Sequence, residues 1–204
     1  GLWRQERKLL LSEGQKVLCL LQSEFSENQH GSVSADFPHR AIDQFQLQYD
    51  QANGGFGGAP KFPMFHVFPF LLDAGSAVMA ANTLRAIRMG GIYDHVGFGV
   101  HRYSTDAEWK LPHFEKMLYD QAMAIVAYTN ASLYCRSREG GNPDSKFHEV
   151  ADEIISFVLR ELTDSSGAFY AAQDADSEGV EGRFYVWEEE ELKGVGAGCV
   201  GRDG

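Results

Sequence analysis

The chain alternates between stretches with a helical spacing of apolar residues and long glycine-rich loops, and this alternation limits the folds it can adopt. Helical spacing covers residues 2–25 and resumes after Pro38. Residues 54–63 then contain glycines and prolines in a density that neither a helix nor a regular strand tolerates. Because long loops inside a compact domain usually carry function, we expect the site to lie on the loops.

The rest of the pattern predicts an all-α fold with short β-hairpins. Pro69 makes residues 65–74 an irregular or kinked helix. Further helices are expected over residues 76–89, 115–136 and 145–162, and strand-like runs over residues 169–172 and 184–187.

Composition excludes several classes of protein. The chain has 204 residues and 44% hydrophobic content, which suffices for a sizeable core. It has no run of roughly 20 apolar residues, and residues 1–8 are polar and basic, so we expect a soluble protein without a membrane partner. The chain lacks an initiating Met, which suggests that it begins partway through a longer protein. A cytoplasmic location is the expectation.

Net charge limits the binding partners of the chain, and its cysteine content indicates the redox state of its surroundings. A net charge of -11 excludes nucleic acid, because binding a polyanion needs a basic surface. The three cysteines, Cys19, Cys135 and Cys199, are odd in number, far apart and without metal-binding spacing, so we expect them reduced and intracellular. Cys19 and Cys135 fall in helical patterns, and we expect both to be small buried residues.

Residues 90–121 have the composition of a site, because histidines, carboxylates and cations alternate there with aromatic residues and glycines. If a helix begins near His113, then Asp120, seven residues on, lies within about 20° of the same face, with Lys116 beside them. A His, a carboxylate and an ammonium suit proton transfer. The alternative is a helix start whose polar groups cap and pair locally.

The preceding loop supplies further candidates. His95 and His101 are possible proton carriers, Asp94 a possible orienting group, and Arg102 the best anchor for an anionic or hydroxyl-rich substrate. The histidines lack a His-x-x-x-His or Glu-bearing helical signature, so we predict no metal and no cofactor.

Acidic residues gather again at residues 173–179. Asp174 and Asp176 resemble the start of a calcium loop, but Tyr185 stands at the twelfth position, where an EF-hand needs Glu. The two carboxylates could serve as acid and base for glycoside chemistry, and the alternative is a solvated acidic turn.

Aromatic residues next to these polar clusters are typical of carbohydrate sites. Trp109, Tyr103 and Tyr119 are the candidates for such platforms, and the alternative for each is a place in the core. Lys61 is the one charge in residues 54–63, and it either points into the same cavity or caps a preceding helix.

Residues 54–63, 90–104, 112–121 and 174–177 together resemble the family of thioredoxin-domain proteins that includes spermatogenesis-associated protein 20. The resemblance implies a thioredoxin-like domain upstream and, in this chain, the first part of an (α/α)6 toroid of the six-hairpin glycosidase-like class. It covers residues 1–192, and residues 193–204 are expected to be a disordered or non-family tail. Members of this fold resemble glycosidases and sugar epimerases.

The leading hypothesis is a carbohydrate-active domain with acid and base chemistry of the epimerase or glycosidase kind. In this hypothesis the histidines carry protons, and the carboxylates orient them and form an acidic wall. The cations and aromatic residues bind a sugar or glycan. The alternative is a non-catalytic binding module accessory to the thioredoxin-like domain. The expected catalytic residues are His95, His101, His113, Asp94, Asp120, Asp174 and Asp176, and the expected substrate-binding residues are Arg102, Lys116, Tyr103, Tyr119, Trp109 and Lys61.

Overall fold

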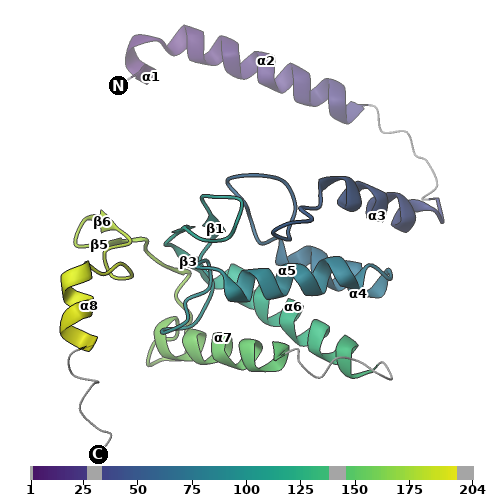
Figure 1. Ribbon diagram of the computed structural model, residues 1–204. Helices are drawn as coiled ribbons and strands as arrows, with labels where there is room; N and C mark the ends of the chain where they lie inside the picture. The colour runs from purple at the N-terminus through teal and green to yellow at the C-terminus, as the bar shows by residue number, and fades with distance from the viewer. Residues whose placement is uncertain (1, 27–33, 138–145, 197–204) are drawn as a thin grey trace, which may run out of the picture. The chain divides into compact units, whose positions relative to one another are not determined.

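A computed structural model describes residues 2–26, 34–137 and 146–196 and divides the chain into two units, Gly1–Phe37 and Pro38–Gly204 (Figure 1). The first unit contains α1 (Leu2–Gln5) and α2 (Arg7–Ser26), which confirms the helix expected there. Cys19 lies exposed on α2, so its expected burial is wrong, and its neighbours Leu18 and Leu20 are exposed too. Cys135 is half-buried, and Cys199 lies outside the described residues.

The second unit is mostly helical, and the helices expected after Pro38 and over residues 76–89 and 145–162 are confirmed. The helix expected over residues 115–136 begins three residues later, at Leu118, and the helix Glu189–Gly196 was not expected. The 3-10 helix η1 and α4 together form the irregular helix expected around Pro69. Gly90 ends α5, as expected. The helices are α3 (Phe37–Gln48), η1 (Phe65–Val67), α4 (Phe68–Asp73), α5 (Ala77–Met89), α6 (Leu118–Arg136), α7 (Phe147–Glu161) and α8 (Glu189–Gly196).

Three short antiparallel strand pairs join these helices. β1 (Tyr103–Ser104) pairs with β2 (Pro112–His113), β3 (Lys116–Met117) with β4 (Ala172–Gln173), and β5 (Asp176–Ser177) with β6 (Val180–Glu181). β4 overlaps the strand expected over residues 169–172. The strand expected over residues 184–187 is wrong, because the chain turns directly after β6. A turn over residues 182–185 occupies part of this segment, and Gly182 at its start has φ +73°.

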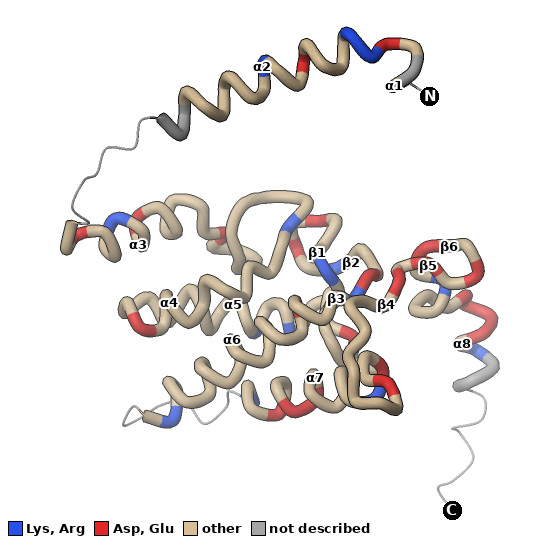
Figure 2. The backbone as a smooth tube through the Cα atoms, turned by 180° about the vertical axis from the view of Figure 1, so that it is seen from behind, with Lys and Arg blue, Asp and Glu red and all other residues tan. Residues whose placement is uncertain are grey.

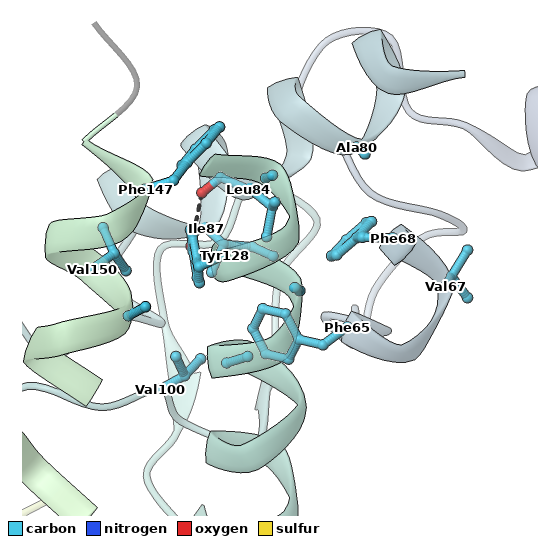
Figure 3. Packing of buried hydrophobic residues seen from close by; sticks show 14 of the residues in the cluster. Phe65, Val67, Phe68, Ala80, Leu84, Ile87, Val100, Tyr128, Phe147 and Val150 are labelled. Carbon is cyan, nitrogen blue, oxygen red and sulfur yellow. Dashed lines mark hydrogen bonds between the residues drawn. The ribbon is translucent and has the colours of Figure 1, made fainter. Parts of the chain in front are cut away.

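The core of the second unit forms around α6, which packs against η1, α4, α5 and α7 (Figures 1 and 3). Small residues such as Ala124, Ala127 and Ala131 are fully buried on α6 and let neighbouring helices approach closely. The Tyr128 hydroxyl donates to the Leu84 carbonyl oxygen over 2.8 Å, so the one polar atom of this buried ring is satisfied (Figure 3). This packing places α6 at the centre of the unit.

Two expectations concern the ends and surroundings of the chain. α8 runs to Gly196 and so crosses the boundary expected after residue 192, while residues 197–204 lie outside the described part; the division into a toroid segment and a tail stays a prediction. Within the described residues, no helix combines the length and the apolar character needed to span a membrane.

Candidate functional site

Backbone pairing brings three separate loops together beside the start of α6. Lys61 and Ser104 exchange backbone hydrogen bonds of 2.8 and 2.9 Å, which attaches the loop of residues 54–63 to β1. Tyr103 pairs with His113 across β1 and β2, and the Arg102 N–H donates to the Glu115 carbonyl oxygen over 2.9 Å. The backbones of these three segments therefore lie side by side.

The buried side chain of Gln121 holds this loop assembly against α6. Its Oε1 accepts from the Val100 N–H at 2.8 Å, and its Nε2 donates to the Val100 carbonyl oxygen at 2.7 Å. The amide thus pairs with Val100 much as a neighbouring strand would, which satisfies backbone groups that lie inside the protein. Arg102 and Tyr103 follow directly, so their position is tied to the helix.

Three rings of this loop assembly form a stack. The ring centroids of Phe62 and Tyr103 lie 4.8 Å apart, and those of Tyr103 and His113 lie 5.0 Å apart with an interplanar angle of 22°. Phe62 is exposed at the outer end of the stack. Exposed aromatic faces next to polar groups are suited to the apolar face of a sugar ring.

Four charged or ionisable side chains, Glu181, His113, Glu115 and Arg102, form a continuous series that we call the charge line. His113 Nδ1 lies 2.6 Å from Glu181 Oε1, and His113 Nε2 lies 3.7 Å from Glu115 Oε2. Arg102 Nη1 donates to the same Glu115 oxygen over 3.1 Å, and this bond raises the pKa of Arg102. Because a carboxylate only accepts, His113 Nδ1 is the donor in its contact with Glu181.

The expected helix face through His113, Lys116 and Asp120 is wrong. α6 begins at Leu118; His113 lies in β2 and Lys116 in β3. Residues 112–117 form backbone hydrogen bonds to the loops and to β4 in place of helical ones. Helical spacing therefore does not govern where these side chains point.

A cavity of about 220 Å³ opens beside the charge line. Asp120 lines it from the first turn of α6, and its Oδ2 is buried without a hydrogen-bond partner. Burial raises the pKa of Asp120 to about 6, although the positive charge of Arg102 opposes this. Met64 lines the same cavity with a left-handed φ of 51°, which is rare outside glycine. The lining residues are Phe62, Pro63, Met64, Phe65, His66, Arg102, Tyr119, Asp120 and Met123.

Lys116 belongs to a separate, buried cluster. Its ammonium lies 2.7 Å from Asp94 Oδ2, donates to the Phe98 carbonyl oxygen over 2.8 Å and sits 4.5 Å from the centre of the Phe157 ring. Burial lowers the pKa of Lys116, and the bond to Asp94 opposes this. Burial by itself would raise the pKa of Asp94, but the bond to Lys116 brings it below its ordinary value. All of these contacts stabilise the ionised pair.

His101 is buried close to that cluster. Its ring packs edge-on against Phe114 and Tyr185, and its Nδ1 donates to the Phe114 carbonyl oxygen over 3.1 Å. Burial lowers the pKa of His101 to about 4, helped by the positive charge of Lys116. The ring is therefore neutral at pH 7.

Lys61 and Trp109 form a second buried cluster. The Lys61 ammonium lies 2.6 Å from Asp50 Oδ2 and 5.3 Å from the centre of the Trp109 ring, and this bond lowers the pKa of Asp50. The Trp109 Nε1–H donates to the Asn53 carbonyl oxygen over 3.0 Å. A Cβ on Gly55 would stand 2.5 Å from the Trp109 ring, which explains the glycine there.

The remaining candidates are exposed. His95 accepts from Arg88 at Nδ1 and donates to the Gly90 carbonyl oxygen at Nε2, away from the residues that line the cavity. Asp174 accepts from the Asp176 N–H, so the pair forms a turn. Asp176 pairs with Glu181 across β5 and β6, which places this acidic hairpin next to His113 (Figure 2).

Sequence reasoning missed Phe62, Glu115 and Glu181 as site residues. Glu115 lies within residues 112–121, yet its contact with Arg102 depends on the pairing of two loops. Glu181 is 68 residues from His113, and no local signal links them. Among the described residues, no three His, Cys, Asp or Glu side chains are grouped so that they could hold a metal ion.

Similar solved structures define the class of fold. A sugar epimerase from a ruminal bacterium matches 65% of this chain and 37% of its own, with a TM-score of 0.51 and 22% identity. Cellobiose 2-epimerase from Bacillus thermoamylovorans B4167 matches 68% of this chain and 40% of its own, with a TM-score of 0.51 and 13% identity. The fold is therefore that of the (α/α)6 six-hairpin glycosidase-like proteins, which confirms the expected class.

Curated relatives confirm the resemblance found in the motifs. Spermatogenesis-associated protein 20 of Homo sapiens is 39% identical over 94% of this chain, and that of Mus musculus is 38% identical over 94%. The chain is thus a homologue of spermatogenesis-associated protein 20 over nearly all its length. It spans about a quarter of these relatives, 26% in both cases. No family model matches it.

Proposed function

We propose that the chain contributes a carbohydrate site to an (α/α)6 domain, with acid and base chemistry of the sugar epimerase or glycosidase kind. The observation that carries the proposal is the position of the charge line beside an aromatic stack and a small cavity. Sugars need aromatic faces for their apolar side and charged hydrogen-bonding groups for their hydroxyls. The two solved neighbours that are named sugar epimerases support the same class.

His113 is the proposed proton carrier. Its Nδ1 donates to Glu181, so its Nε2 can accept a proton from the substrate, and the carboxylates of Glu181 and Glu115 stabilise the imidazolium that forms. Arg102 then donates to a substrate oxygen while Glu115 holds its guanidinium in place.

The buried clusters have a different role in this proposal. The ammonium groups of Lys61 and Lys116 each have a carboxylate and a carbonyl partner already, and both side chains are fully buried. We therefore assign Lys61, Lys116, Asp94 and Trp109 to holding the loops in position rather than to touching a sugar.

The test is a screen of glucose, mannose, N-acetylglucosamine and cellobiose for a rise in melting temperature, followed by calorimetry on any that bind. We expect a sugar to bind, and His113→Gln to keep binding while abolishing exchange of substrate C–H protons for deuterium or release of a glycoside leaving group. His148→Gln, an exposed histidine on α7, is the matched control.

Two results would contradict the proposed function. If no sugar binds the folded chain, the proposal is wrong, and the alternative of a non-catalytic module accessory to a thioredoxin-like domain gains support. If a sugar binds and reacts equally well with His113→Gln, the site lies elsewhere.

A further inference from the structure

We infer that Asp120 is the specificity-determining residue of the site, accepting a hydrogen bond from one hydroxyl of a single sugar ring that enters the cavity beside Arg102. The inference rests on the proposed function and deepens it. It assigns the substrate class as one sugar ring, free or at the end of a glycan.

The first observation is the unpartnered oxygen. Asp120 Oδ2 is the one buried side-chain nitrogen or oxygen in the described residues that lacks a hydrogen-bond partner. Buried polar atoms are nearly always paired, so a carboxylate oxygen without a protein partner next to a cavity has an acceptor site that a ligand hydroxyl can fill. Rotation about the last torsion of Asp exchanges its two oxygens at small cost, so either oxygen can face the cavity.

The second observation is the size and lining of the cavity. Its volume of about 220 Å³ is below the roughly 300–1,000 Å³ of pockets for drug-sized ligands. One ring fits such a space, and any further rings of a glycan would lie outside it. Phe65, Met64 and Met123 supply an apolar wall, and Arg102 supplies donors opposite the acceptor on Asp120.

The third observation is the charge around Asp120. The groups that face the cavity or act on Asp120 are Arg102 before β1, Glu115 between β2 and β3, Tyr119 on α6 and His66 on η1. Arg102 is engaged by Glu115, so it does not neutralise Asp120 by direct pairing. Burial raises the pKa of Asp120 to about 6, so at pH 7 the carboxylate is ionised and accepts only.

The experiment pairs Asp120→Asn with a series of sugars that each lack one hydroxyl. The ligand is whichever of glucose, mannose or N-acetylglucosamine binds the wild-type chain, and its 2-, 3-, 4- and 6-deoxy forms are compared by calorimetry at pH 7.5. We expect Asp120→Asn to weaken binding of the parent sugar by about 10- to 100-fold, the worth of a hydrogen bond to a charged group. The deoxy sugar that lacks the hydroxyl bound by Asp120 should bind the wild type about as weakly as the parent sugar binds Asp120→Asn. The substitution should weaken the binding of that deoxy sugar little further.

A pH series and a control sharpen the test. Binding to the wild type should weaken below pH 6 as Asp120 takes a proton, and binding to Asp120→Asn should not follow that profile. Asp152→Asn makes the same chemical change on an exposed position of α7 and should leave affinity unchanged. Asp120→Ala, checked by circular dichroism, replaces Asp120→Asn if the latter does not fold.

The outcomes separate this inference from the proposed function. Binding that Asp120→Asn and Asp120→Ala both leave unchanged overturns the role of Asp120 alone, and the orphan oxygen then holds only water. If no single deoxy sugar reproduces the loss caused by Asp120→Asn, the assignment of Asp120 to one hydroxyl of one ring is overturned. Absence of binding by every sugar overturns the proposed function and the sugar class together.

Discussion

The two buried lysine pairs and the partly exposed charge line contain the same kinds of side chain in different environments. The side chain of Lys116 is 1% exposed and that of Asp94 11%, whereas the side chain of Arg102 is 37% exposed and that of Glu181 50%. Both lysines also donate to a carbonyl oxygen, so each ammonium is surrounded by partners. Satisfied buried pairs fix a structure, while exposed charges beside an orphan carboxylate remain available to a ligand.

Burial separates structural from available charges within a cluster of ionisable residues. Lys116 and Arg102 both looked like substrate anchors in the sequence, and only burial separates them. Two of the three N–H donors of the Lys116 ammonium have protein acceptors, and burial keeps a substrate from the third, whereas the guanidinium of Arg102 is partly exposed. The same reasoning distinguishes Asp94, which accepts from Lys116 and two backbone N–H groups, from Asp120.

Removing a buried lysine should have the largest effect. Lys116→Ala leaves the Asp94 charge unpaired inside the protein, so we expect a loss of about 3–5 kcal/mol in the free energy of unfolding. Urea unfolding measures it. Lys110→Ala, at an exposed lysine paired with Glu108, is the control and should have little effect on stability. Equal losses in the two variants would contradict a structural role for the buried pair.

A methyl group in the second lysine cluster should have a smaller effect. Gly55→Ala puts a Cβ 2.5 Å from the Trp109 ring at a residue with φ +80°, so we expect a loss of about 1–3 kcal/mol from overpacking and strain. Gly58→Ala lies in the same loop, where an added Cβ meets nothing within 4 Å, and should be nearly neutral. Denaturant midpoints of both variants provide the comparison. A neutral Gly55→Ala would show that Trp109 and Lys61 are loosely packed.

Acid should destabilise the region around His101. Its pKa is about 4 in the folded chain and 6.5 in an exposed histidine, so the unfolded state binds the proton first. The stabilising effect of the neutral ring is therefore complete above pH 6.5 and is lost as the pH falls toward 4. Melting temperatures between pH 4 and 8 should show this slope in the wild type and a flatter one in His101→Gln. Identical slopes would mean that His101 is hydrated.

The smallest effect on stability is expected in the charge line. Arg102→Ala removes a partly exposed ion pair with Glu115, so the free energy of unfolding should fall by less than about 1 kcal/mol. The same variant should abolish the melting-temperature rise caused by a bound sugar. Arg85→Ala, an exposed arginine on α5, is the control for general charge effects. A large loss of stability in Arg102→Ala would place the charge line with the structural pairs.

Sequence pattern determined the helices, because their signals are local. The apolar spacing of α7, the proline near the start of α4 and the glycine that ends α5 all act within a few residues. The motifs in the loops likewise indicated the family and the (α/α)6 class. The same local reasoning placed the start of α6 too early, because residues 112–117 have partners in distant strands.

The tertiary structure decided which candidates share a site. Glu181 reaches His113 across 68 residues, and β4 reaches β3 from beyond α7, so no periodicity along the chain could reveal these contacts. Burial separates the hydrogen-bonded lysine pairs from the partly exposed charge line. The reason is that the free energy of a charged group depends on the solvent and the partners around it. Residue type determined the possible chemistry of Lys116, Arg102 and Asp120. Their surroundings decided which of them is structural and which is available to a ligand.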